Sequence, residues 1–240
     1  MISNLLDYRG NIQFFDEEKI PPKEDIMSIL NTVHDKLPHV NFKWLYNLNV
    51  LGPEDSEEKK KIAVSSFCGD GPNSLKKEKW YRDRTRSLSD SDINHLYKVY
   101  DKWRKYQKEE KPDVIGEPQP DDPDIYSFNE QVRAPWVIAY RKIGNENIDQ
   151  RRSYIQIGNH SMITALLALE KGYDVSFCSC FIFRKEFGYK IWKEGDPEIV
   201  LTLSIGWPDL PRRTQATNSK LAPQFGVGPG IKPDLESIIL

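Results

Sequence analysis

The segment from Ile157 to Leu169 contains no Asp, Glu, Lys or Arg, and its apolar residues are spread around the whole circumference of a helix. A helix that is apolar all round has no face suited to water, so it belongs at the centre of a protein. Gly172 follows it, and glycine is the residue that most often terminates a helix in the left-handed conformation. We therefore predict a buried central helix at about 157–171.

Several β-like runs can supply a sheet for this helix to pack against. They lie at 44–51, 62–67, 134–140, 175–183 and 199–205. The run at 62–67 predicts a long-looped hairpin with 44–51, across the turn pair Gly52-Pro53. Pro135 is expected at the start of its strand, because proline cannot donate to a β-ladder.

Two more helices are predicted from apolar residues at helical spacing. One covers about 23–36, after Pro21-Pro22, and the other about 90–108, with Ser89 or Asp90 as N-cap. Strands and helices alternate without a regular βαβ rhythm. The sequence therefore predicts an α+β fold with a central mixed or antiparallel sheet flanked by helices.

The composition changes between 68 and 131, where charged residues and prolines dominate. We interpret 1–240 as a single domain, in which 68–131 is a charged insertion or lid and 211–240 is an extended C-terminal tail. The 34 Lys and Arg residues nearly balance the 36 Asp and Glu residues, leaving a formal net charge of −2. That balance provides no overall field to attract nucleic acid or an anionic membrane.

The cysteine count, the N-terminal segment and the lengths of the apolar stretches indicate where the protein is located. An odd count of three cysteines is unlike a disulfide framework and fits a reducing compartment, so a cytoplasmic protein is expected. The N-terminus lacks the pattern of a secretory signal, and no apolar stretch approaches the roughly 20 residues that span a bilayer. No membrane association is expected.

Few residues form a recognisable catalytic or metal-binding pattern. Cys178-x-Cys180 is too closely spaced for a metal knuckle, so we expect structural or backbone roles for these cysteines and no metal site. No nucleophile motif is present, and His160 is expected to cap or pack its helix. The basic and aromatic run at 76–86 could track a nucleic acid, but Glu78 and Asp83 interrupt it, which favours a solvated or internally paired surface.

Several short motifs occur in a particular order along the chain. The first three are Arg9-Gly-Asn-Ile-Gln-Phe14, Pro38-His-Val-Asn-Phe-Lys-Trp44 and Val132-Arg-Ala-Pro135. They are followed by Ile157-Gly158 and by Leu203-Ser-Ile-Gly-Trp-Pro208, which precedes a basic pair. This order resembles the nitroreductase family of FMN-dependent flavoproteins, over about 9–51 and 132–213.

The resemblance implies a nitroreductase-like fold and a set of FMN-binding residues. Arg9, Asn11 and Gln13 match the family segment that reaches the flavin phosphate, ribityl chain and pyrimidine edge, and Asn41 and Lys43 match a pair near the ring edge. Gln13 stands where the family has a base, so we expect weaker stabilisation of the reduced flavin and a lower potential.

The same resemblance assigns two later segments to the cofactor. Backbone N–H groups around Cys178 and Ser179 correspond to the stretch that lines the flavin. Arg212 or Arg213 can supply a second cation for the dianionic phosphate, whose oxygens suit a guanidinium.

The function implied by the resemblance is FMN-dependent transfer of electrons from NAD(P)H to a small electrophile such as a nitroaromatic or quinone. A homodimer with the flavin at its interface is expected, with no obligatory catalytic side chain. Two alternatives stay open. One is a nitroreductase-like module that has lost turnover and serves in flavin binding or protein interaction, and the other is a nucleic-acid-binding protein that uses 76–86.

Overall fold

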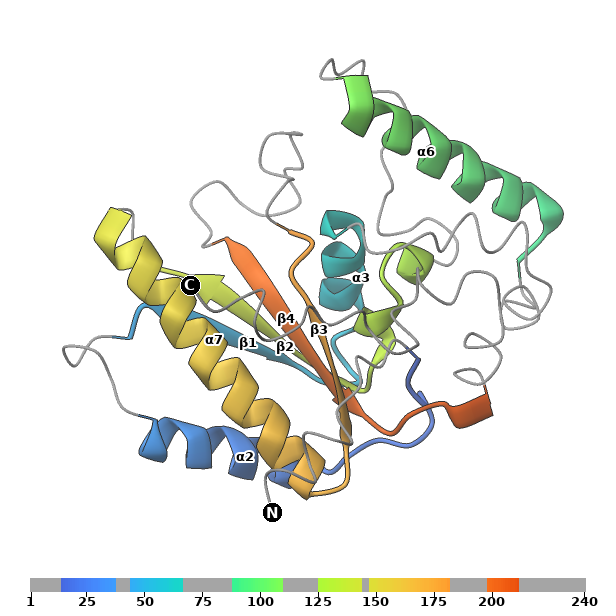
Figure 1. Ribbon diagram of the computed structural model, residues 1–240. Coiled ribbons are helices and arrows are strands. Elements are labelled where there is room, and N and C mark those ends of the chain that lie inside the picture. The colour runs from blue at the N-terminus through green and yellow to red at the C-terminus, as the bar shows by residue number, and fades with distance from the viewer. Residues whose placement is uncertain are drawn as a thin grey trace, which may run out of the picture.

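The structure is a computed structural model that describes residues 14–37, 44–66, 88–109, 125–143, 147–181 and 198–211. Figure 1 shows the helices and strands of these segments. In chain order they are α2 (Lys23–Lys36), β1 (Tyr46–Leu51), α3 (Ser56–Ser65), α6 (Asp90–Glu109), the 3-10 helices η1 (Ile125–Phe128) and η2 (Glu130–Arg133), β2 (Trp136–Lys142), α7 (Asn147–Glu170), β3 (Asp174–Cys178) and β4 (Ile199–Gly206).

The strands form a four-stranded sheet in the order β1-β2-β4-β3. All pairings between these strands are antiparallel, with Ile138 opposite both Val50 on β1 and Leu203 on β4. Leu203 in turn lies opposite Phe177 on β3. The expected α+β architecture with an antiparallel sheet is confirmed, and the predicted strands at 44–51, 134–140 and 199–205 correspond to β1, β2 and β4.

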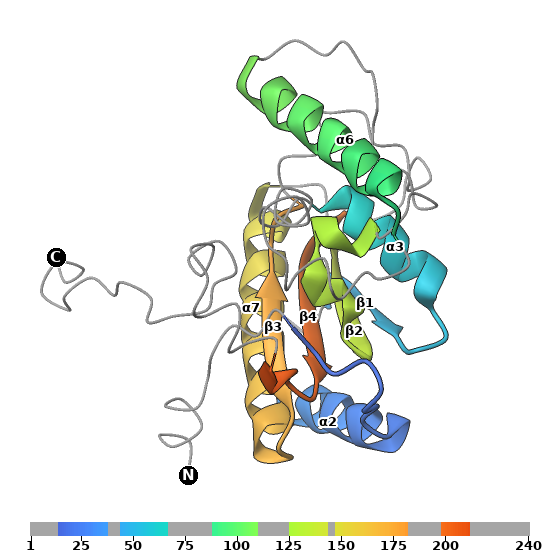
Figure 2. The ribbon, with the colours of Figure 1, turned by 90° about the vertical axis from the view of Figure 1, so that its right-hand side faces the viewer.

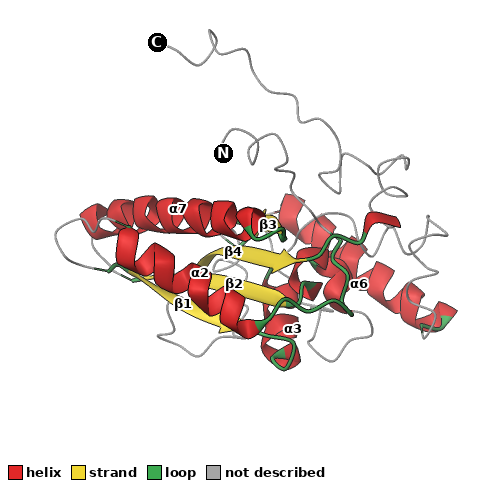
Figure 3. Cartoon of the chain, turned by 90° about the horizontal axis from the view of Figure 1, so that it is seen from below, coloured by secondary structure: helices red, strands yellow, loops and turns green. Residues whose placement is uncertain are grey.

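Helical layers cover both faces of the sheet (Figures 2 and 3). On one face, α2 and α7 bury Ile26, Ile29 and Ala165 against strand residues such as Ile138. On the other face, α3, η1 and η2 lie against the same strands; an apolar cluster there joins Ile62 of α3 to sheet residues and is called the α3 cluster below. Alternate residues of a strand face opposite sides, so each strand contributes to both layers.

The predicted central helix is confirmed as part of α7, which begins ten residues earlier at Asn147. It ends as expected: Gly172 has φ +88°, its N–H donates to the Leu169 carbonyl, and the Tyr173 N–H donates to the Ala168 carbonyl. These two bonds form a Schellman motif. Burial is one-sided, since Ile155 is 58% exposed and Ile163 37% exposed, on the side of the helix away from the sheet.

The predicted β-like run at 62–67 is wrong, because residues 56–65 form α3. The β-branched residues Ile62 and Val64 suggested a strand, but the preceding residues are strong helix formers with acidic residues in the first turn. Glu57 and Glu58 pair with Lys60 and Lys61 at i, i+3 spacing. The Gly52-Pro53 turn therefore leads into a helix.

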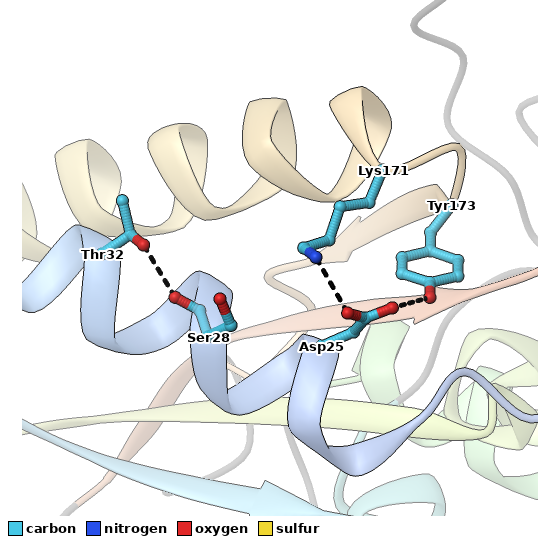
Figure 4. Close-up of polar contacts among 5 residues, drawn as sticks. All are labelled: Asp25, Ser28, Thr32, Lys171 and Tyr173. Atoms are coloured by element: carbon cyan, nitrogen blue, oxygen red, sulfur yellow. Dashed lines mark hydrogen bonds and ion pairs between the residues drawn. The ribbon is translucent and has the colours of Figure 1, made fainter.

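A polar contact joins α2 to the end of α7 (Figure 4). The Asp25 carboxylate accepts hydrogen bonds from Lys171 Nζ at 2.8 Å and from the Tyr173 hydroxyl at 2.5 Å. These bonds hold the pKa of Asp25 below its ordinary value, the Lys171 contact being the larger cause. The contact fixes the start of α2 beside the turn that leads into β3.

The predicted helix at 90–108 is confirmed as α6, which lies beyond α3 in Figures 1 and 2. Ser89 is its N-cap, because its Oγ accepts from the Asp92 N–H while an Asp92 carboxylate oxygen accepts from the Ser89 N–H. Ile93 and Leu96 are buried. Within the described residues, no helix is both long and apolar enough to cross a membrane.

Candidate cofactor site

The N-terminal flank of the described structure pairs with the segment after β4. The Asp16 N–H donates to the Trp207 carbonyl at 2.8 Å, and the Asp209 N–H donates to the Phe14 carbonyl at 3.0 Å. Between these bonds, Phe15 and Pro208 form an antiparallel bridge. The described residues next to the predicted segments 9–13 and 212–213 are therefore hydrogen-bonded neighbours.

The close approach of this N-terminal flank requires a glycine at the end of β4. A Cβ on Gly206 would lie 2.8 Å from Cδ of Pro135 and 3.0 Å from Cδ1 of Phe15. Phe15 is 1% exposed and packs in the α3 cluster. The pairing of the N-terminal flank with residues 207–209 is thus anchored in the core.

The end of β3 carries the two predicted flavin-lining residues that the structure describes. Cys178 lies opposite Thr202 in the sheet, is 2% exposed, and its Sγ accepts a hydrogen bond from Asn129 Nδ2 at 3.5 Å. Ser179, the next residue, is exposed beyond the end of the strand. The side chain of Cys178 therefore serves the core, while Ser179 is accessible to a ligand.

The other predicted site residues lie outside the described residues. They are Arg9, Asn11, Gln13, Asn41, Lys43, Arg212 and Arg213. The structure thus brings together the neighbours of the first and last of these segments and leaves their side chains as predictions. The basic run at 76–86 also lies outside the described residues.

A buried polar layer beneath β3 and β4 was not predicted. Cys178, Thr202 and Ser204 point to the same side of the sheet as η1 and η2. Several buried atoms in this region have no hydrogen-bond partner among the described residues: Ser127 Oγ, Asn129 Oδ1, both amide atoms of Gln131, Thr202 Oγ1 and Ser204 Oγ. Buried polar groups normally bond to protein, ordered water or a ligand, so this layer has unused capacity for polar contacts.

The sequence contains a signal for this layer that is easily misread. Thr202 and Ser204 alternate with Leu201, Leu203 and Ile205, a pattern typical of a strand with one face in water. Both polar residues are fully buried instead, because the α3 cluster, with Ile62 of α3 and Val132 of η2, lies on that side of the sheet. Gln131 and Asn129, in a segment that composition marks as polar and irregular, complete the layer.

His160 belongs to a second buried polar group, on the opposite face of the sheet. It lies within α7 rather than at a helix start, and its Nδ1 is 3.0 Å from the Tyr140 hydroxyl and 3.2 Å from Thr164 Oγ1. Burial lowers the pKa of His160 to about 4, with His34 as a lesser cause. The packing role expected for this histidine is confirmed. Burial favours the neutral imidazole, which contacts the Tyr140 hydroxyl.

The described residues do not form a metal centre or a catalytic triad. No group of three or more His, Cys, Asp or Glu side chains within these segments could hold a metal ion. Of the two predicted site residues that the structure describes, Ser179 is exposed and directly follows β3. The paired flank Phe14–Asp16 with Trp207–Asp209 bonds to itself through its backbone, so it holds the two neighbouring segments together.

Comparison with known proteins identifies the fold. No protein-family model matches the chain, and no curated protein matches its sequence. Among solved structures, an FMN and NADPH-dependent nitroreductase, NfnB from Sphigopyxis sp. strain HMH, matches with a TM-score of 0.55 and 15% identity, over 100% of this chain and 97% of that one.

Two further solved structures agree with this match. The FMN-dependent nitroreductase NfnB from Mycobacterium smegmatis, in complex with NADPH, has a TM-score of 0.52 and 13% identity over 99% of this chain and 96% of that one. A BluB-like flavoprotein from Clostridium difficile 630 has a TM-score of 0.51 and 15% identity over 100% and 98%. The chain therefore has the nitroreductase fold that the order of its motifs predicts.

Proposed function

We propose that the protein is an FMN-dependent oxidoreductase that transfers electrons from NAD(P)H to a small electrophile such as a nitroaromatic or quinone. The observation that carries the proposal is the pairing of Phe14–Asp16 with Trp207–Asp209. Arg9 precedes the first segment by a few residues, and Arg212 and Arg213 follow the second. Cations from the two ends of the chain can therefore reach a common phosphate.

The proposal that Arg9 and Arg212 bind one phosphate is supported by the short stretches of chain between them and the paired flank. A chain spans at most about 3.6 Å per residue, so Arg9 and Arg212 depart from the paired flank on short tethers. A phosphate dianion binds a guanidinium bidentately, which favours arginine at both positions. Asn11, Gln13, Asn41 and Lys43 are proposed to contact the remainder of the FMN.

Ser179 and the backbone around Cys178 are proposed to line the flavin from the end of β3. The exposed position of Ser179 supports this role, since its backbone and hydroxyl are available beyond the last strand residue. FMN, when bound, accepts a hydride and passes electrons onward, so the residues of this chain need only bind and orient it. The proposal accordingly assigns no catalytic acid or base.

A second copy of the chain is the proposed partner. The outer side of α7 exposes Ile155 and Ile163, at 58% and 37% of their surface. They are eight residues apart, which places them along one stripe of the helix, and exposed apolar stripes of this kind mark protein interfaces. A symmetric dimer would bury the same stripe twice.

The segment at 68–131 is proposed as an insertion within a single domain. Its last residues pack under the sheet, where Phe128 and Gln131 are buried. The charged part that precedes them is proposed as a lid or partner surface.

Nitroreductase-fold proteins described as FMN- and NADPH-dependent support the cofactor assignment.

The experiment is a spectral titration of the purified full-length chain. We expect a yellow protein whose flavin absorbance bleaches when NADH or NADPH is added without oxygen, and recovers when a quinone or nitroaromatic is added. A yellow protein inert to both nucleotides would instead indicate a flavin-binding module without turnover. A colourless protein that fails to bind added FMN would contradict both, and salt-dependent retention on nucleic acid would then favour the run at 76–86.

A further inference from the structure

Cys178 and Cys180 lie close together where the chain leaves the sheet. Cys178 is the last residue of β3, and Cys180 is in the turn that follows. Two residues apart, their Cα atoms are separated by at most about 7 Å, and a turn shortens that distance. Disulfides join Cα atoms about 4.4–6.8 Å apart, so these two cysteines are within bridging range.

Both side chains pack on the same side of the sheet. Cys178 is a member of the α3 cluster, and Cys180 packs against that cluster as a partly buried residue. Both are present as thiols. Packing against one cluster places both cysteines on the side of the sheet that α3 covers.

The two thiols differ in access to solvent. Cys178 is 2% exposed, whereas Cys180 is only partly buried. Asn129 Nδ2 donates to the Sγ of Cys178 at 3.5 Å and to the Ser66 hydroxyl at 2.7 Å. Asn129 thus contacts the buried sulfur, while Cys180 is the more exposed of the two cysteines.

We propose that Cys180 and Cys178 form a peroxide-reactive dithiol that closes to a disulfide across Ser179. The Cys180 thiolate attacks one oxygen of a hydroperoxide, the O–O bond breaks, and water or an alcohol leaves, giving a sulfenic acid. The Cys178 thiol sulfur then attacks the Cys180 sulfur, the S–O bond breaks, the hydroxyl leaves as water with the thiol proton, and the S–S bond forms. Two thiols are oxidised, and one peroxide is reduced by two electrons.

The small ring closed by this disulfide makes it easy to reduce. Bridges that depart from relaxed geometry store strain, and strained disulfides have more oxidising potentials and are the labile ones. An ordinary dithiol reductant should therefore restore both thiols. The proposal does not depend on flavin binding, because peroxide is the oxidant.

The test is peptide mapping of the full-length protein after treatment with hydrogen peroxide and alkylation. Trypsin places both cysteines in one peptide, Gly172–Arg184, and the third cysteine in Ile62–Lys76. We expect the first peptide to resist alkylation and to weigh less by two hydrogen atoms, with recovery after dithiothreitol. Two alkylated cysteines in that peptide after peroxide treatment, or a crosslink to Ile62–Lys76, would overturn the proposal.

Single variants separate the two roles. In Cys178→Ser, Cys180 should stop at the sulfenic acid, which a dimedone probe traps. In Cys180→Ser, the buried Cys178 should stay reduced and be alkylated only after unfolding. Equal dimedone labelling of the two variants would contradict the assigned order of attack. Thermal unfolding of each variant shows that it is folded before labelling.

Discussion

The hydroxyl of Tyr140 lies 3.0 Å from Nδ1 of His160, a contact that joins the central strand β2 to α7 inside the core. His160 is 2% exposed and Tyr140 is fully buried. The ring of Tyr46 meets the imidazole edge-on with centroids 5.4 Å apart, and His34 of α2 adds a repulsive charge when it is protonated. Burial and the charge of His34 therefore favour the neutral imidazole.

The first prediction is that acid destabilises the protein through His160. Its pKa in the folded state is about 4, below the value of about 6.5 expected in the unfolded chain. Between these values the unfolded state binds more protons, so the free energy of unfolding falls as pH falls from about 6.5 to 4. The loss approaches about 1.4 kcal/mol per pH unit and about 3 kcal/mol in all. Urea denaturation across this range measures it.

His160→Gln should remove most of that slope, because the amide does not titrate. His95→Gln, at an exposed position on α6, is the matched control and should keep the slope. An acid slope of equal size in both variants would show that another group is responsible.

The second prediction concerns two glycines with opposite surroundings. Gly206→Ala forces a methyl group against Pro135 and Phe15, so we expect a loss of about 1–3 kcal/mol in the free energy of unfolding. Gly158→Ala, in the middle of α7, meets nothing within 4 Å and should stabilise by about 0.5–1 kcal/mol. Chemical denaturation of the two variants gives both values. Similar effects at the two positions would contradict the tight packing at the end of β4.

The third prediction concerns the dimer. Ile155→Asp places a charge on the exposed stripe of α7, so it should shift the chain toward monomer at a given concentration, as measured by analytical ultracentrifugation. Ile20→Asp is the control, since Ile20 is 49% exposed and lies before α2. If both variants sediment like the unmodified protein, the α7 stripe is not the interface.

The fourth prediction concerns the cofactor phosphate. Arg9→Ala should weaken FMN binding at least about tenfold, because a hydrogen bond to a charged group contributes about 1.5–3 kcal/mol. Lys23→Ala removes an exposed cation from α2 and should leave affinity unchanged. Flavin fluorescence titration provides both constants, and an unaltered affinity in Arg9→Ala would remove Arg9 from the site.

Helical periodicity and capping residues predicted the framework well. The apolar spacing of α2 and the glycine at the end of α7 are local signals, and the structure confirms both. The error at α3 arose because two β-branched residues at the end of a helix resemble a short strand. There the helix-forming residues that precede them, and packing of Ile62 against the sheet, decide the outcome.

The sequence predicted less of the candidate site than of the fold. The resemblance assigned Arg9 and Arg212 or Arg213 to one phosphate, and these residues lie outside the described structure, so the assignment stays a prediction. The described residues next to them, Phe14 and Asp209, are hydrogen-bonded. The buried polar layer could not be predicted, because burial of Thr202 and Ser204 depends on packing of α3 and η2 on that side of the sheet. Such contacts join residues far apart in the chain, so no periodic pattern in the sequence indicates them.

The bridge between Phe15 and Pro208 also has a consequence for biosynthesis. The partners lie far apart in the sequence, so they can pair only after the intervening chain has been made. During translation, the N-terminal flank leaves the ribosome long before Trp207–Asp209 have been made. Its place beside the sheet is therefore filled only after Trp207–Asp209 have been made, and a ligand that requires both segments binds after that point.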